Sequence, residues 1–367
     1  MFGDKKLNIY RCVNIGEITH LPLEDQAVII DTDFNTLPDG YGLYLTSGEL
    51  PISGNVKKLL KHCVSGSFIL ETEDGITLLE TSDIPDRTIF TTGLCNSNCI
   101  MCPYTEYFRG HSKLEPLAML KRFIDLMDPN AEYVCITGGE PTLLRDDFLK
   151  LVEHFKNHFY GAMLHILTNG RTFAYKNFLI DFQKFRPYKT LLGIPIHADN
   201  ADLHDYISQA KGSFEETLLG LDNLYNAGEY IELRIVTSKL NHTNLPDLAR
   251  MIVKRYPYCQ HVCLMGLEMM GNAMINREVV WCNYNELWSF VREATDILVA
   301  NGIEVELYNY PLCIVERRLQ PLYRKSITPS KVEYLHECEF CRRKSECGGF
   351  FRTTKIMSDI QVKPCYE

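Results

Sequence analysis

The chain has 367 residues, 46% of them hydrophobic and 23% charged, which is the composition of a globular protein with a sizeable core. Its 38 Lys and Arg residues against 47 Asp and Glu residues give a net charge of −9. This charge argues against nucleic-acid binding, which needs clustered cations. The sequence shows neither a signal-peptide core nor an apolar run long enough to span a membrane, so we expect a cytoplasmic protein that binds no membrane.

Residues 1–86 are predicted to form a small β-rich N-terminal module. Short strand-like runs there are separated by turn signals such as Pro38-Asp-Gly and Glu73-Asp-Gly. One short helix is expected around Val56–Cys63. The sequence carries no peptide-binding signature in this module, so its role is left open.

Residues 87–302 alternate strand-like and amphipathic segments, which is typical of parallel α/β folds. The expected strands are Ile89–Thr92, Tyr133–Thr137, Met163–Thr168, Leu191–Ile196, Glu232–Val236 and His261–Gly266. The expected helices are Glu115–Met127, Asp146–His158, Phe173–Phe182, Phe214–Ala227, Leu245–Lys254 and Tyr284–Ala300. Six such units predict a partial (β/α)6 TIM-type barrel. The chemistry should lie at the C-terminal ends of its strands.

Residues 303–367 are predicted to form a small cysteine-rich C-terminal domain. The strand-like run Ile303–Tyr308 is followed by several prolines and a cysteine group, without a helical period. A region of this kind is expected to be organised by metal rather than by a large apolar core.

Fourteen cysteines are the unusual feature of the composition. In a reducing compartment, patterned cysteines usually bind metal or catalyse reactions. One group has the pattern C-x3-C-x2-C (Cys95, Cys99, Cys102) and another C-x2-C-x5-C (Cys338, Cys341, Cys347). Cys313 and Cys365 flank the second group. Six others are interpreted as small buried hydrophobes: Cys12, Cys63, Cys135, Cys259, Cys263 and Cys282.

The first group supplies three thiolates directly after a predicted strand. Thiolates suit zinc, copper(I) or iron–sulfur clusters, and three protein ligands leave one coordination position open. An open position fits either a cluster with a reactive iron or a catalytic zinc ion. Three loop cysteines without metal are the remaining alternative.

This pattern resembles the signature of radical S-adenosylmethionine (SAM) enzymes. The resemblance implies that Cys95, Cys99 and Cys102 hold a 4Fe–4S cluster whose open iron is chelated by SAM. Met101 stands where the superfamily commonly has an aromatic residue near the adenine, and a thioether is a plausible substitute there.

Further segments resemble SAM-contacting elements of the same superfamily. Gly138-Gly139-Glu140-Pro141 resembles the GGEP motif, which contacts the SAM amino group, and Asn169 lies in a Thr-Asn-Gly element that is equally consistent with a helix-capping turn. His197 ends the fourth strand, where the family contacts the SAM ribose or carboxylate. A purely structural histidine is the alternative at that position.

Two more candidates come from the last strands. Arg234 and Glu232 alternate onto one strand face, so Arg234 either points inward to the SAM carboxylate or forms an outward ion pair. Leu267 lies in a segment that resembles the adenine-contacting segment of the superfamily.

The second cysteine group resembles the auxiliary-cluster region (SPASM or Twitch domains) of radical SAM peptide-modifying enzymes. Phe351 replaces a further cysteine of the longer form, which favours one auxiliary iron–sulfur cluster held by Cys338, Cys341, Cys347 and a fourth ligand. Cys313 is the preferred fourth ligand and Cys365 the alternative. A zinc knuckle remains open.

The closest resemblance is to His-Xaa-Ser system radical SAM maturases of the C subfamily, over most of the chain from Pro85 to Phe351. It implies an oxidoreductase that modifies a ribosomally made precursor peptide. Expected partners are that peptide, reduced flavodoxin or ferredoxin as electron donor, and a second radical SAM maturase. Alternatives are a small-molecule or protein substrate, a non-enzymatic iron–sulfur electron carrier, and a zinc-stabilised binding module. The sequence identifies no catalytic acid or hydrogen donor.

Overall fold

The computed structural model describes residues 9–14, 19–31, 41–45, 48–49, 64–72, 75–80, 87–329, 331–357 and 360–366. The helix expected around residues 56–63 lies outside these ranges. None of the helices in the described ranges is both long enough and apolar enough to cross a lipid bilayer.

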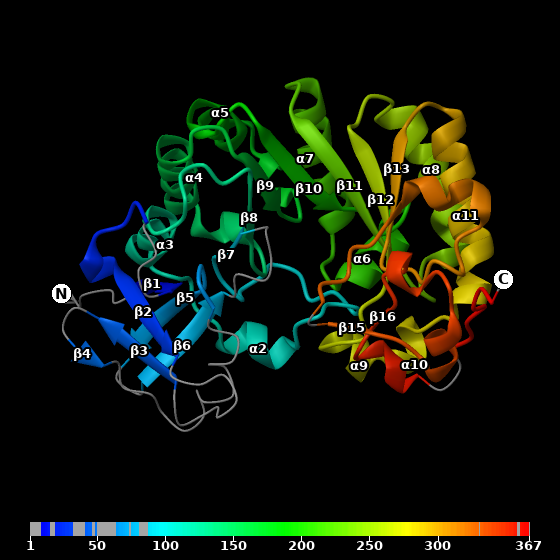
Figure 1. Ribbon diagram of the computed structural model, residues 1–367. Helices are drawn as coiled ribbons and strands as arrows, with labels where there is room; N and C mark the ends of the chain where they lie inside the picture. The colour runs from blue at the N-terminus through cyan, green and yellow to red at the C-terminus, as the bar shows by residue number, and fades with distance from the viewer. Residues whose placement is uncertain are drawn as a thin grey trace.

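The N-terminal region forms a six-stranded sheet, as its β-rich sequence predicts (Figure 1). Its order is β4-β3-β2-β1-β5-β6, and only the β1–β2 pair is parallel. The strands are β1 (Ile9–Asn14), β2 (Gln26–Asp31), β3 (Tyr41–Leu45), β4 (Gly48–Glu49), β5 (Phe68–Thr72) and β6 (Gly75–Glu80). Phe68 packs edge-on against Phe123 of α3, with ring centroids 5.0 Å apart, and so joins this sheet to the main core.

The main sheet has eight strands in the order β14-β13-β12-β11-β10-β9-β8-β7, and every neighbouring pair is parallel. The six predicted strands are β7 (Arg87–Phe90), β8 (Tyr133–Thr137), β9 (Met163–Leu167), β10 (Thr190–Pro195), β11 (Tyr230–Thr237) and β12 (His261–Gly266). The predicted partial barrel is therefore confirmed. Two further strands, β13 (Glu304–Tyr308) and β14 (Tyr323–Arg324), extend it.

The larger helices cover the outer face of this curved sheet (Figure 1). They are α3 (Leu117–Asp125), α4 (Asp146–His158), α5 (Lys176–Phe185), α7 (Ser213–Asn226), α8 (Leu245–Arg255) and α11 (Tyr284–Ala300). Short helices flank the C-terminal ends of the strands, namely α2 (Glu106–His111), α6 (Ala201–Ser208), α9 (Asn272–Ile275) and α10 (Arg277–Val280). Apolar residues on the strands and helices form one continuous core between the two layers.

The C-terminal part begins inside the main sheet, because β13 pairs with β12. Beyond β14, the chain forms the antiparallel pair β15 (Val332–Glu333) and β16 (Phe350–Phe351), with two 3-10 turns, His336–Phe340 and Lys344–Glu346, between them. The domain boundaries predicted after residues 86 and 302 stay predictions.

The inner face of the barrel carries polar side chains. Alternate residues of a strand share a face, and a Cβ atom added to Gly193 of β10 would lie 2.7 Å from His165 Nε2 of β9 and 3.1 Å from Arg234 Cδ of β11. These side chains therefore meet inside the barrel, below the loops that follow the strands.

Candidate functional site

The first cysteine group lies in the loop after β7. Asn272 of α9 holds this loop through its side-chain amide, which donates to Asn98 Oδ1 at 3.0 Å and to the Cys99 carbonyl at 3.1 Å. The backbone N–H groups of Asn98 and Ile100 also bond to carbonyls at the end of α6, at 3.0 and 2.9 Å. The loop is thus fixed on two sides, which pre-orients its thiols.

The three thiols lie close enough to influence one another. Burial raises the pKa of Cys95 to about 11. Burial, followed by the charges of Cys102 and Cys95, raises that of Cys99 to about 12. The positive charge of Arg109 lowers the pKa of both thiols, but by less than burial raises it. Without a cation the thiols of Cys95 and Cys99 stay protonated, so a bound metal centre is what would convert them to thiolates.

Gly138 and Gly139 allow two segments of backbone to come together. A Cβ atom at Gly139 would lie 2.2 Å from the Leu94 carbonyl oxygen, and one at Gly138 would lie 2.6 Å from the Thr92 carbonyl oxygen. The Glu140 N–H also donates to the Leu94 carbonyl at 2.8 Å. These glycines therefore lock the turn after β8 against the cysteine loop, as well as lining the cavity beside it.

Glu140 is fully buried, with 0% of its surface exposed. One carboxylate oxygen accepts bonds from the Thr142 N–H at 3.1 Å, the Thr142 hydroxyl at 2.6 Å and the Thr168 hydroxyl at 2.7 Å. The other accepts from the Asn169 N–H at 2.6 Å. Four donors therefore surround the carboxylate, and it joins the turn after β8 to the turn after β9. Contact with the SAM amino group stays a prediction.

A cavity of about 390 Å³ opens beside the cysteine loop, over the C-terminal ends of β8 to β12. It brings together most of the residues predicted for SAM and its cluster: Cys95, Cys99, Cys102, Gly138, Gly139, Asn169, His197 and Arg234. Residues from six successive loops and strands thus meet around one space. This is the location that the fold favours for chemistry.

Four predicted residues are described but lie outside this lining, the buried Glu140 among them. Met101 and Leu267 are only 6% exposed and pack in one apolar cluster, against which Cys99 rests. Pro141 is buried and begins the 3-10 turn Pro141–Leu144. Their predicted roles toward SAM remain untested, and in the structure they support the walls of the site.

His197 and His204 form a buried pair at the cavity wall. Burial and the proximity of His204 lower the pKa of His197 to about 3, and burial lowers that of His204 to about 4. The backbone N–H of His197 donates to His204 Nδ1 at 3.3 Å. Within the described part of the chain, His197 Nδ1 is buried without a hydrogen-bond partner. Both rings are therefore neutral at physiological pH.

Arg234 points into the barrel and also forms an ion pair, so neither sequence alternative describes it completely. Its guanidinium donates to Glu232 on the same strand and lines the cavity. Desolvation opposes its charge, but the carboxylate of Glu232 raises the net pKa of Arg234. Arg234 therefore supplies a permanent cation inside the barrel.

Sequence reasoning missed several polar residues of the cavity wall, among them Arg171 and His204. Arg171 donates to the Asn96 carbonyl at 2.8 Å and pairs with Glu216 at 2.6 Å, which links the cysteine loop to α7. His204 lies in a Leu-His-Asp-Tyr segment, but its helix position alone gave no signal that it faces the cavity.

A second cavity, of about 430 Å³, lies in the C-terminal part between β13 and the 3-10 turns. Five cysteines line it: Cys313, Cys338, Cys341, Cys347 and Cys365. The structure thus places both candidates for the fourth ligand near the C-x2-C-x5-C group.

Backbone N–H groups point at the sulfur atoms of this cavity. The N–H groups of Leu312 and Gly349 lie 3.3 Å from Cys347 Sγ, that of Cys365 lies 3.3 Å from Cys341 Sγ, and that of Lys363 lies 3.5 Å from Cys313 Sγ. Basic side chains also line the cavity, namely Arg317, Arg343, Lys344 and Lys363. Donors and cations of this kind stabilise thiolate-bound, negatively charged clusters.

Comparison with known proteins bears on the part of the chain that carries the first site. Residues 89–252, which carry the cysteine loop and β7 to β11, match the profile of the Radical SAM superfamily. This part of the chain is a radical SAM domain. Among curated proteins, the mycofactocin maturase MftC of Mycolicibacterium smegmatis is 27% identical over 219 residues, which are 58% of this chain and 51% of that protein.

One further curated protein and one solved structure are also similar to this chain. The probable GTP 3′,8-cyclase of Thermoplasma volcanium is 24% identical over 276 residues, covering 73% of this chain and 79% of the cyclase. The crystal structure of Streptococcus suis SuiB superposes with a TM-score of 0.50 at 14% identity, covering 78% of this chain and 59% of SuiB. The chain spans only about half the length of the mycofactocin maturase, and SuiB shows the fold alone.

Proposed function

We propose that this protein is a radical SAM maturase that modifies a ribosomally made precursor peptide of the His-Xaa-Ser type. The single observation that carries the proposal is that one chain has a cavity lined by the C-x3-C-x2-C cysteines and a separate cavity lined by five cysteines. The similarity to a mycofactocin maturase supports a maturation role. The resemblance to His-Xaa-Ser maturases carries the choice of peptide, and the patterned thiols fit a reducing cytoplasm.

The donor set at the first site fits a 4Fe–4S cluster and SAM. Cys95, Cys99 and Cys102 would hold the cluster, leaving one iron open. Once reduced by flavodoxin or ferredoxin, the bound cluster would supply the electron that splits SAM into methionine and a 5′-deoxyadenosyl radical. Arg234 and Asn169 would orient SAM from the opposite wall of the cavity.

The other walls of this site would add no positive charge and would stay in fixed positions. The imidazole rings of His197 and His204 are neutral at physiological pH, so they add no positive charge beside the cluster loop. Glu140 would act as a positioning residue, because its four hydrogen bonds hold Asn169 and the neighbouring turn in place. Fixed walls of this kind exclude water from a reactive radical.

The second cavity would hold one auxiliary iron–sulfur cluster. Cys338, Cys341 and Cys347 would be three ligands, and Cys313 would be the fourth, because the electrostatic neighbours of its thiol include Cys347 and Cys338. The four basic side chains around the cavity would compensate the charge of the thiolate-bound cluster. Such a cluster would take an electron from the product radical or position the peptide.

Anaerobic reconstitution with iron and sulfide, followed by dithionite and SAM, tests the proposal. We expect 5′-deoxyadenosine from SAM alone and a mass change in a co-expressed His-Xaa-Ser peptide. A fully loaded protein that releases no 5′-deoxyadenosine would contradict the radical SAM step. A protein that releases 5′-deoxyadenosine but leaves the peptide unchanged would contradict the assignment of a His-Xaa-Ser peptide as the substrate.

A small-molecule substrate is the second candidate, because the GTP 3′,8-cyclase similarity covers more of this chain than the maturase similarity does. Incubation of the loaded protein with GTP separates the two. A new GTP-derived product, with no change in the peptide, would favour the cyclase-like reaction. An electron carrier, by contrast, would leave SAM intact in both assays.

A further inference from the structure

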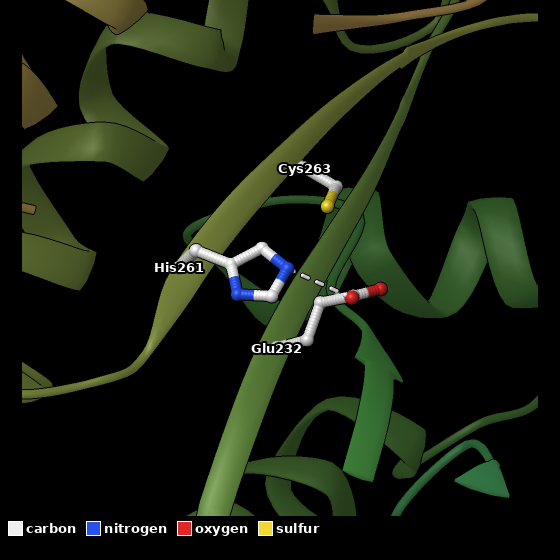
Figure 2. Close-up of side chains that lie close together, drawn as sticks. All are labelled: Glu232, His261 and Cys263. Atoms are coloured by element: carbon white, nitrogen blue, oxygen red, sulfur yellow. Dashed lines mark hydrogen bonds and ion pairs between the residues drawn. The ribbon is translucent and has the colours of Figure 1, made fainter. Parts of the chain in front are cut away.

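A group of metal-ligand side chains lies inside the barrel, below the SAM cavity. Glu232 comes from β11, and His261 and Cys263 come from the neighbouring strand β12 (Figure 2). One donor atom of each lies within 4.8 Å of the donor atoms of the other two. The sequence interpretation of Cys263 as a packing residue missed this arrangement, because the strand pattern does not show which polar residues face it.

Glu306 of β13 lies beside two of these three donors. His261 Nε2 lies 2.9 Å from Glu232 Oε2 and 3.7 Å from Glu306 Oε2. Cys263 Sγ lies 4.0 Å from Glu306 Oε2. Around a tetrahedral zinc ion, neighbouring nitrogen, oxygen and sulfur donors are separated by roughly 3.2–3.8 Å. Small side-chain adjustments would therefore bring the donor atoms of Glu232, His261 and Cys263 to one centre, and a larger turn of the Glu306 side chain would add the fourth.

Two arginines orient the carboxylates toward this centre. Arg234 bonds to Oε1 of Glu232, and Arg324 Nε donates to Oε1 of Glu306 at 2.7 Å. In each carboxylate the second oxygen, Oε2, is the one nearest to His261; Oε2 of Glu306 also accepts a hydrogen bond from the Tyr308 hydroxyl, which would have to turn away when an ion binds. Outer hydrogen bonds that fix one oxygen and present the other are the usual support of metal-ligating carboxylates.

His165 of β9 is an independent sign of a ligand. It is only 5% exposed, its Nδ1 is hydrogen-bonded to the Tyr133 hydroxyl, and burial lowers its pKa to about 4. Its Nε2 has no hydrogen-bond partner among the described residues and points at Glu232 Oε2 from 3.8 Å. A neutral, buried imidazole with one unused nitrogen is a ready metal donor, and Gly193 leaves room above it.

We propose that Glu232, His261, Cys263 and Glu306 bind one transition-metal ion, with His165 available as a further donor. One thiolate, one imidazole and two carboxylates form a mixed set that suits zinc. Binding would release the thiol proton of Cys263 and any proton held by His261. The ion would join β11, β12 and β13 below the SAM cavity, and the partly exposed side chains of His261 and Glu306 provide the entry route.

Zinc binding to the whole, cluster-loaded chain tests the proposal. The reconstituted protein would receive one equivalent of zinc chloride and be desalted, and zinc would then be measured by mass spectrometry and X-ray absorption. We expect about one zinc ion per chain with a first shell of one sulfur and three or four nitrogen or oxygen atoms. Retention of no zinc, or a shell of three or four sulfurs as in the two cysteine cavities, would overturn the proposal.

Matched variants locate the ion. Cys263→Ser and His261→Gln should weaken zinc binding by at least about 100-fold, because each removes a direct ligand. Cys259→Ser and His154→Gln, which change a buried cysteine and a helix-surface histidine outside the group, should bind zinc like the original chain. Equal zinc affinity in all four variants would overturn the assignment. If a variant fails to fold, the absorption spectrum of the unmodified chain decides the question by itself.

Discussion

Replacing Glu140 by Gln separates a positioning role from direct SAM binding. The carboxylate accepts three bonds on one oxygen and one, from the Asn169 N–H, on the other. A glutamine side chain retains one acceptor oxygen and turns its NH2 group toward a donor. The lost bond to a charged acceptor costs about 1.5–3 kcal/mol, and the unpaired buried N–H adds to that loss.

We therefore expect Glu140→Gln to lower the free energy of unfolding by about 3 kcal/mol or more. SAM affinity should fall together with stability, because Asn169 is no longer held at the cavity wall. Urea unfolding measures the first effect, and calorimetric titration of SAM into the cluster-loaded protein measures the second. Glu153→Gln, on the exposed face of α4, is the matched control and should change neither. Unchanged stability together with lost SAM binding would refute the positioning argument and favour direct contact.

Four further outcomes follow from the two sites. Cys99→Ala should abolish SAM cleavage and the iron of the first cluster, as measured by iron content and 5′-deoxyadenosine, whereas Cys341→Ala should retain cleavage but yield no modified peptide. Separate Cys313→Ser and Cys365→Ser variants should differ in auxiliary iron content, with the larger loss in Cys313→Ser; the reverse order would make Cys365 the fourth ligand. Asn272→Ala removes three hydrogen bonds around the cysteine loop and should lower SAM affinity at least tenfold, an expectation that unchanged titration curves would contradict. In the folded chain His197 stays neutral, whereas in the unfolded chain it gains a proton below pH 6.5, so acid lowers the free energy of unfolding. His197→Gln should remove about 2 kcal/mol of this decrease between pH 6.5 and 5, as measured by urea unfolding.

The sequence predicted the barrel well because its elements are strongly periodic. The expected ranges of β8, β12, α4 and α11 coincide with the observed ones. The alternation that places Glu232 and Arg234 on one strand face also holds in the structure, since their side chains bond to each other. The spacing of residues along the chain was sufficient to predict these features, because each of them depends on residues that are close together in sequence.

Features that depend on distant contacts were not predictable in the same way. The pairing of β13 with β12 made a strand assigned to the C-terminal region part of the main sheet. The burial of Glu140 depends on donors from the turn after β9, 28 residues away. Likewise, only the folded chain shows that Cys365, near the end of the sequence, reaches the same cavity as Cys313. Each of these arrangements is set by tertiary packing rather than by a local motif.

Arg234 connects the cavity beside the cysteine loop with the proposed metal site below it. Its guanidinium lines the SAM cavity while it is bonded to Glu232 below. A carboxylate that binds in the cavity would share the positive charge of Arg234 with Glu232. This sharing would change how strongly Glu232, His261 and Cys263 bind a metal ion. Because linkage is reciprocal, an ion bound at the proposed metal site would change the affinity of such a carboxylate by the same factor. Arg234 would then couple the proposed metal site to the cavity above it.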